Sequence, residues 1–91
     1  MRTLDINKTY RKDLKGVLKQ GWDAEKINNV VLELLTNDIL SPSLKDHALK
    51  GDLKDFRECH IFGDLVIIYK RNDTELHLYR IGRHQDLFKQ Y

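Results

Sequence analysis

The sequence predicts an α+β fold, in which two consecutive helices are followed by an antiparallel sheet. Three observations support this prediction. Apolar residues recur at helical spacing up to residue 35, three strand-like runs follow residue 55, and hairpin turn residues separate those runs. Helices and strands that are segregated along the chain are typical of α+β proteins. A chain of 91 residues supports one hydrophobic core, so we expect one domain over residues 1–91.

The first part of the chain predicts a short strand and a helical hairpin. Residues 3–6 alternate polar and apolar side chains, as a strand does. Asn7 or Thr9 offers an N-cap for a first helix, which should end at Gly21, and Asp23 caps a second helix. Apolar residues repeat at three- and four-residue intervals in both helices. They are Tyr10, Leu14, Val17 and Leu18 in the first, and Ile27, Val30, Val31, Leu34 and Leu35 in the second.

An irregular connection and three strands are expected in the rest of the chain. Residues 37–55 are polar, contain Pro42 and Gly51, and carry Asp46 and His47. A connection of this length in so small a domain indicates a function. The remaining elements are strands at 56–62, 65–71 and 75–81, hairpin turns at 63–64 and 72–73, and a terminal helix or arm at 84–91 that carries Leu87 and Phe88. The run 65–69 is apolar on both faces, which predicts the centre of the sheet.

The side-chain period of a strand assigns residues 57–61 to two faces. Glu58 and His60 share one face, and the residues that alternate with them share the other, which we expect to meet the core. A two-residue turn would pair His60 with Ile67 and put Asp64 at the hairpin tip.

Composition excludes several classes of protein. No apolar run approaches the roughly 18 to 20 residues of a membrane span, and residues 1–5 lack the apolar core of a signal peptide, so we expect a cytosolic protein. Cys59 is the only cysteine, which excludes an intrachain disulfide and a cysteine-based zinc cluster. The net charge is only +2, but Asp13 is the single acid in residues 8–19. This segment presents either a positive face for phosphates or an ordinary solvated helix surface.

Three of the four histidines are candidates for proton transfer, because an imidazole both takes and gives a proton near neutral pH. His47, His60 and His84 could converge on one edge of the sheet, whereas His77 is interpreted as an ordinary strand residue. Zinc sites normally use closely spaced ligand pairs, which this sequence lacks, so we expect no metal or other cofactor. The two serines at 41 and 43 lack the strand-turn-helix context of a catalytic nucleophile.

RNA cleavage suits such a group of histidines. The 2′-hydroxyl attacks the adjacent phosphorus, so the protein must remove one proton, deliver another to the leaving 5′-oxygen and stabilise the extra phosphate charge. Histidines with a carboxylate and an arginine meet these requirements. DNA lacks the 2′-hydroxyl and would resist this route.

Five motifs in the second half resemble, in order and spacing, the YafQ branch of the RelE/ParE toxins. They are KDHALKG at 45–51, FRECH at 56–60, DLVIIYK at 64–70, RIGRH at 80–84 and LF at 87–88. The resemblance implies a strand and two helices packed on a curved antiparallel sheet, with a short C-terminal helix or arm. It also implies a toxin that cleaves mRNA at the ribosome, a cognate antitoxin that neutralises it, and operator DNA bound only through the toxin-antitoxin complex.

The resemblance carries functional residues to five positions. His47, His60, Asp64 and His84 match the catalytic set, and Phe88 matches an aromatic residue near the substrate. We expect His84 to be the general acid that protonates the leaving oxygen. His60 or His47, oriented by Asp64, would activate the 2′-hydroxyl or stabilise the phosphate.

Other residues have two interpretations each. Arg80 is a candidate clamp on the scissile phosphate, provided that the last hairpin has the right register. Glu58 stands where some relatives carry aspartate, and it is either a substrate contact or a structural partner of a neighbouring His or Arg. Arg57 is expected to be structural, and Phe88 could instead anchor the terminal arm.

Two alternative functions remain. A ParE-like toxin shares this fold but acts on DNA gyrase, and it needs no proton-transfer groups. A nonenzymatic protein, either an inactive toxin or an RNA-binding repressor partner, would not need its histidines to converge. The three candidate histidines favour the nuclease over both.

Overall fold

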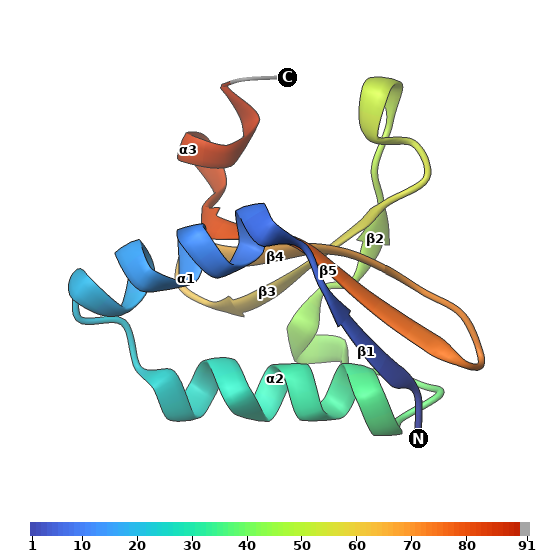
Figure 1. The fold of residues 1–91 in the computed structure, drawn as a ribbon. Coiled ribbons are helices and arrows are strands. Elements are labelled where there is room, and N and C mark those ends of the chain that lie inside the picture. Colours follow the sequence, from blue (N-terminus) through green and yellow to red (C-terminus); the bar gives the residue numbers. More distant parts are fainter. Residues whose placement is uncertain (90–91) are drawn as a thin grey trace.

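The computed structural model describes residues 1–89 and contains a five-stranded sheet with helices on both sides (Figure 1). The strands are β1 (Thr3–Ile6), β2 (His47–Ala48), β3 (Arg57–Phe62), β4 (Leu65–Arg71) and β5 (Glu75–Arg83). The helices are α1 (Lys8–Lys19), α2 (Ala24–Thr36) and α3 (His84–Phe88), and the 3-10 turns are η1 (Pro42–Leu44) and η2 (Gly51–Leu53). The predicted terminal helix or arm is α3, and residues 90–91 of that prediction lie outside the described residues.

The two long helices form where their caps and apolar stripes predict. Asn7 is the N-cap of α1, since its side chain accepts a hydrogen bond from the backbone N–H of Thr9 at 3.3 Å. Asp23 caps α2 in the same way, through Glu25 at 2.9 Å. Gly21 has a φ of 92°, which favours glycine and turns the chain between the helices. Within residues 1–89, no helix has both the length and the apolar character needed to cross a membrane.

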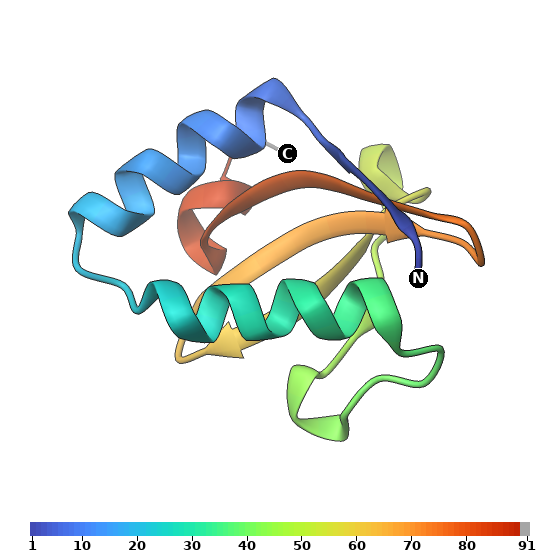
Figure 2. The same cartoon turned by 60° about the horizontal axis from the view of Figure 1, so that its bottom comes forward.

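The strand order is β1-β5-β4-β3-β2, and the sheet is mixed rather than wholly antiparallel. β1 runs parallel to β5, and every other neighbouring pair is antiparallel. A parallel pair requires a long crossover, which the chain between β1 and β5 provides. Figure 2 shows the strong curvature of the strands, with α1 and α2 joined by a short turn at one end.

The turn between β3 and β4 has two residues, as predicted, but the strand register beyond it differs from the prediction by one residue. Gly63 has a φ of 57° and Phe62 pairs with Leu65, as a two-residue turn requires. The register then shifts between His60 and Phe62, so that His60 stands opposite Val66. The predicted pairing of His60 with Ile67 was therefore wrong, because a β-bulge adds one residue to β3.

A second irregularity fixes the position of Arg80. The register between β4 and β5 shifts after Ile68, which leaves Arg80 opposite Ile68. On its other side, Ile68 stands opposite Glu58. Directly opposed residues of antiparallel strands point to the same face. Glu58, Ile68 and Arg80 therefore form one row across three strands.

β4 is the central strand, as predicted, and buries apolar side chains on both faces. The larger cluster, which faces α1 and α2, includes Tyr10, Ile27 and Leu34 from the helices and Cys59, Ile67 and Tyr69 from the sheet. The smaller cluster on the opposite face consists of Leu53, Val66, Ile68 and Leu87. Fully burying such a side chain contributes about 1.5–3 kcal/mol, so both clusters hold the sheet in place.

The connection between α2 and β3 is more ordered than the sequence indicated. Besides two 3-10 turns it contains β2, which pairs with the edge of β3. His47 stands opposite Glu58, and Ala48 stands opposite Arg57. The connection therefore carries His47 to the same part of the sheet as Glu58 and His60.

Candidate active site

The candidate site lies on the side of the sheet opposite α2. Figure 1 shows α3 and the β2–η2 segment rising from that side, with the central strands below them. His84 is the first residue of α3, His47 is the first residue of β2, and His60 lies on β3. Three separate elements thus bring one imidazole each toward the same place.

Glu58 is the point on which the three imidazoles converge. Its Oε1 lies 3.2 Å from Nε2 of His60 and 3.6 Å from Nε2 of His47. Its Oε2 lies 3.5 Å from Nε2 of His84. The structure therefore brings together His47, His60 and His84, as the sequence predicted, but around a carboxylate to which the sequence assigned a minor place.

The carboxylate of Glu58 is buried and short of hydrogen bonds. Only 1% of the Glu58 side chain is exposed, and neither carboxylate oxygen has a hydrogen-bond partner among residues 1–89. A buried carboxylate without donors is strongly destabilising. A proton on any of the three neighbouring rings would offset this cost. The cluster is therefore suited to hold a proton and to pass it on.

The imidazoles are more accessible than the carboxylate beneath them. The side chains of His47 and His84 are each 52% exposed and that of His60 is 28% exposed. The rings thus form a rim that a substrate can reach, with Glu58 below it. This geometry favours the interpretation of Glu58 as a partner of the histidines over a direct substrate contact.

The backbone beside His47 fixes which ring nitrogen faces Glu58. Nδ1 of His47 lies 2.8 Å from the carbonyl oxygen of Lys45. Since a carbonyl only accepts, Nδ1 carries the hydrogen in this contact, and Nε2 is left toward Glu58. Lys45 has a φ of 50°, in the left-handed region, and this conformation folds its carbonyl back to the ring.

His84 is held by its main chain and by α3. Its backbone N–H donates to the carbonyl oxygen of Asp64 at 2.8 Å. Its ring packs against Phe88 with the ring centroids 4.6 Å apart. Phe88 also joins the smaller apolar cluster, so it lies beside the candidate acid and anchors α3 at once. Gly82 lets α3 pack closely on β5, because a Cβ there would lie 3.1 Å from the side chain of Leu87, which would have to shift.

Asp64 lies in the hairpin turn, as expected, but its side chain does not make the contact expected of it. Its carboxylate accepts a hydrogen bond from Nε of Arg83 at 2.8 Å, instead of orienting His60 or His47. This hydrogen bond lowers the pKa of Asp64 below its ordinary value. The role of orienting imidazole nitrogens thus falls to Glu58, while Asp64 contributes through its main-chain contact to His84.

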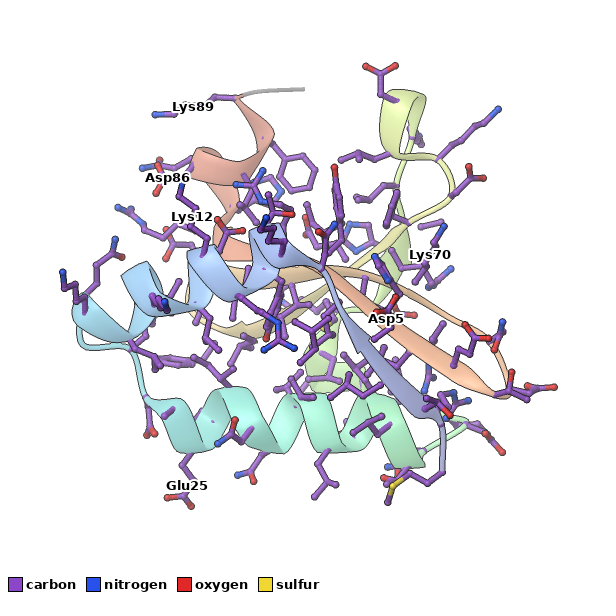
Figure 3. The ribbon with its side chains drawn as sticks, in the orientation of Figure 1. Asp5, Lys12, Glu25, Lys70, Asp86 and Lys89 are labelled. Carbon is purple, nitrogen blue, oxygen red and sulfur yellow. The ribbon has the colours of Figure 1, made fainter. Side chains whose placement is uncertain are left out.

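Arg80 contacts a carboxylate on α1. Its Nε lies 2.6 Å and its Nη2 3.2 Å from the oxygens of Asp13. The pair borders a groove of about 560 Å³ between α1 and α3. Charged side chains lining the groove are Lys12, Asp13, Arg80, Arg83, Asp86 and Lys89, of which Lys12, Asp86 and Lys89 are labelled in Figure 3. A phosphate would have to compete with Asp13 for the guanidinium.

His77 lies outside the cluster. Its Nδ1 contacts Oδ2 of Asp5 at 2.7 Å, across the pair of β1 and β5. Within residues 1–89, no group of three or more His, Cys, Asp or Glu side chains is arranged to hold a metal ion.

Sequence reasoning missed a second network, which lies beside His47. Asp46 accepts hydrogen bonds from Nε of Arg57 at 3.0 Å and from Nη2 at 2.7 Å, and it also accepts one from the hydroxyl of Tyr69. Arg57 was expected to be structural, but its partner was not identified. The sequence feature that could have indicated this network is the direct adjacency of Asp46 and His47 within one motif.

The mixed sheet, the helical hairpin and a histidine–carboxylate cluster on the open face define a RelE-like α+β protein. The family model described as "Bacterial toxin of type II toxin-antitoxin system, YafQ" matches residues 2–89. The chain is also 34% identical over 88 residues to the mRNA interferase toxin YafQ of Escherichia coli strain K12, covering 96% of each chain. The chain therefore belongs to the YafQ toxin family of type II toxin-antitoxin systems.

Solved structures agree with this assignment and confirm the predicted fold class. YafQ in the DinJ–YafQ toxin-antitoxin complex of E. coli is 34% identical, with a TM-score of 0.87 over 96% of this chain and 97% of that one. A metal-bound toxin from Helicobacter pylori is 44% identical, with a TM-score of 0.86 over 97% of this chain and 100% of that one.

Proposed function

We propose that this protein is an endoribonuclease toxin that cleaves mRNA and thereby inhibits translation. One observation carries the proposal: the Nε2 atoms of three imidazoles lie 3.2 to 3.6 Å from a single buried carboxylate. Proton transfer is the chemistry that such a cluster supports, and RNA cleavage through the 2′-hydroxyl requires two proton transfers. The name of the E. coli relative, mRNA interferase toxin, supports the same substrate.

His84 is the general acid in this proposal. It approaches Oε2 of Glu58, whereas His47 and His60 approach Oε1. The acid thus stands apart from the other two rings, and a scissile phosphate across the rim would have its attacking and leaving oxygens near different imidazoles. His47 or His60 removes the proton of the 2′-hydroxyl, and the other stabilises the phosphate charge.

Neighbouring residues complete the proposed site. Glu58 supports whichever imidazole carries the proton, because its buried charge favours an adjacent cation. Arg80 exchanges Asp13 for the phosphate when RNA binds, and Phe88 offers a ring face on which a base can stack. Asp64 acts through its main-chain contact to His84 and its hydrogen bond with Arg83.

A cognate antitoxin is the proposed protein partner. The E. coli relative forms a toxin-antitoxin complex with DinJ, which supports an equivalent partner here. Cleavage takes place in the cytoplasm on ribosome-bound mRNA, and operator DNA is bound only through the complex with the antitoxin.

Primer extension on RNA from cells that express the toxin tests the proposal. Wild type should produce defined cleavage ends, and His84→Ala should lose them together with toxicity, because the leaving oxygen then lacks its acid. His77→Ala is the matched control, since His77 contacts Asp5 at the far edge of the sheet. Normal cleavage by His84→Ala would contradict the assignment of the acid.

A second experiment separates the proposed ribonuclease from a gyrase inhibitor. Pulse labelling should show that protein synthesis stops before DNA synthesis, and the reverse order would favour a gyrase inhibitor.

Because one H. pylori relative binds a metal, cleavage should also be measured in the presence of a chelator. Cleavage by purified protein should persist in EDTA, because side chains perform every proposed proton transfer. A loss that added metal restores would contradict this mechanism.

A further inference from the structure

The position of His47 depends on a very short element. β2 has two residues, and its flanking segments on both sides are turns. The side chain of His47 is half exposed, so packing around the ring does not hold it. A catalytic imidazole nevertheless has to stay within a fraction of an ångström of its working position. Some other contact must therefore hold β2 in place.

Asp46, the residue before β2, supplies that contact. Its carboxylate binds Arg57 on β3 and Tyr69 on β4, which stand opposite each other in the sheet. A guanidinium that binds a carboxylate through two nitrogens is among the strongest and most directional of hydrogen-bonded pairs. Tyr69 is fully buried, so its hydroxyl is a fixed donor. The start of β2 is thus tied to the two strands at the rigid centre of the protein.

The charge states of this network suit a permanent anchor. Burial alone would raise the pKa of Asp46, but hydrogen bonds from Arg57 and Tyr69 outweigh it and hold that pKa below its ordinary value. Burial, together with the hydrogen bond to Asp46, raises the pKa of Tyr69. The carboxylate therefore stays charged and the phenol stays a donor throughout the neutral range.

The anchor also controls the orientation of the ring. Asp46 lies between Lys45, whose carbonyl accepts from Nδ1 of the imidazole, and His47, whose Nε2 faces Glu58. Fixing Asp46 fixes the backbone on both sides of it, and so the left-handed turn at Lys45. Without the anchor, Lys45 would relax from this uncommon conformation and the contact to Nδ1 would be lost.

The geometry points to Asp46 and Tyr69 as positioning residues for His47: they hold β2 against the sheet and keep Nε2 of this imidazole directed at Glu58. Neither residue touches the substrate. Both act through His47, so the kinetic part of this inference rests on the proposed ribonuclease function. The structural part concerns the free protein and stands without it.

Two variants and one matched control test the inference. Tyr69→Phe removes only the hydroxyl, and Asp46→Asn keeps the size of the side chain but removes its charge. Tyr10→Phe is the control, because it deletes a similarly buried phenol from the same core on the helix side. Circular dichroism selects the variants that remain folded, and at least one of the two substitutions is conservative enough to do so.

Long-range ¹H–¹⁵N spectra of the imidazoles give the readout that needs no substrate. Wild type and Tyr10→Phe should show His47 as the Nδ1–H form, and Tyr69→Phe or Asp46→Asn should shift His47 to a mixture of both forms. The signals of His60 and His84 should stay near their wild-type values. Unchanged His47 signals in both folded variants would overturn the inference, whether or not the protein cleaves RNA.

Cleavage kinetics give the second readout. The rate constant should fall by roughly 10- to 100-fold in Tyr69→Phe, with KM for RNA within about twofold of wild type, because a misplaced group affects the chemical step. In a His47→Ala background, Tyr69→Phe should cause no further loss. An equal loss in both backgrounds would overturn the inference. Absence of cleavage by wild type would instead refute the proposed function, and the spectra would still decide the role of Asp46.

Discussion

The carboxylates on the two faces of the sheet differ in how well their hydrogen bonds are satisfied. On the face toward α1 and α2, the partly exposed Asp46 lies against Tyr69 and accepts hydrogen bonds from it and from Arg57. On the open face, both oxygens of Glu58 are buried and have no hydrogen-bond partner among the described residues. Buried polar groups in a stable scaffold are normally satisfied, so the unsatisfied carboxylate makes this face the candidate for the proposed chemistry.

The largest expected effect on the helix-side face is on stability. Leu34→Ala should lower the free energy of unfolding by about 3 kcal/mol, because Leu34 is fully buried in the larger apolar cluster and its truncation leaves a cavity. The cleavage rate per folded molecule should stay unchanged. Urea denaturation measures the first quantity and active-site titration of the folded fraction the second. Normal stability with slow cleavage in this variant would contradict the assignment of stability to one face and of cleavage to the other.

A substitution on the opposite face, which carries Glu58, should lower the cleavage rate without lowering the stability. Glu58→Gln should reduce cleavage about 100-fold, since the imidazoles lose the charge that supports their protonated forms. Its free energy of unfolding should be equal to or higher than that of wild type, because an unsatisfied buried charge is removed. Paired measurements of single-turnover cleavage and urea denaturation check both. A large loss of stability would show that Glu58 belongs to the scaffold.

Acid should weaken the helix-side network in particular. The folded-state pKa of Asp46 lies below the ordinary 3.8, so its charged form stabilises the fold above about pH 4. This contribution is lost as the pH falls from about 4 through the lower native value. Wild type should therefore lose stability over this range more steeply than Asp46→Asn, as chemical denaturation at a series of pH values would reveal. If the free energy of unfolding changed with pH equally in wild type and Asp46→Asn, the lowered pKa of Asp46 would be contradicted.

The smallest effect concerns Cys59, which lies between Glu58 and His60 in sequence but points to the helix-side core. Burial, with the nearby carboxylates of Asp46 and Glu58, raises the pKa of its thiol to about 12. The folded protein should therefore not react with a thiol reagent at pH 8 and should react fully once unfolded. Rapid labelling of the native protein would mean that the two faces are assigned wrongly at β3.

Periodicity was sufficient to predict most of the fold. Helical spacing and caps identified α1 and α2, and alternation with turn residues identified β3, β4 and β5. The bulge between His60 and Phe62 was not predictable, because β3 ends at Phe62 and too few residues follow the bulge for a shift in the alternation to show. The parallel pairing of β1 with β5 was missed for a related reason, since it joins segments that are distant in the sequence.

The residue types of the candidate site were predictable from the sequence, but the contacts between their side chains were not. The histidines at 47, 60 and 84 could be selected because imidazoles suit proton transfer and because a family resemblance covered them. The central place of Glu58 depends on the pairing of β2 with β3, and β2 is too short to be recognised from sequence. Asp64 was paired with a histidine in the prediction, but the structure gives its carboxylate to Arg83, a residue whose exposed guanidinium no pattern had singled out.

The most direct test is to record the imidazole ¹⁵N chemical shifts of wild type and Glu58→Gln under identical conditions. Signals from His47, His60 and His84 should all move, because each ring faces the same carboxylate, while the signals of His77 should not. A change confined to one ring, or none, would contradict the shared carboxylate at the centre of the proposed active site.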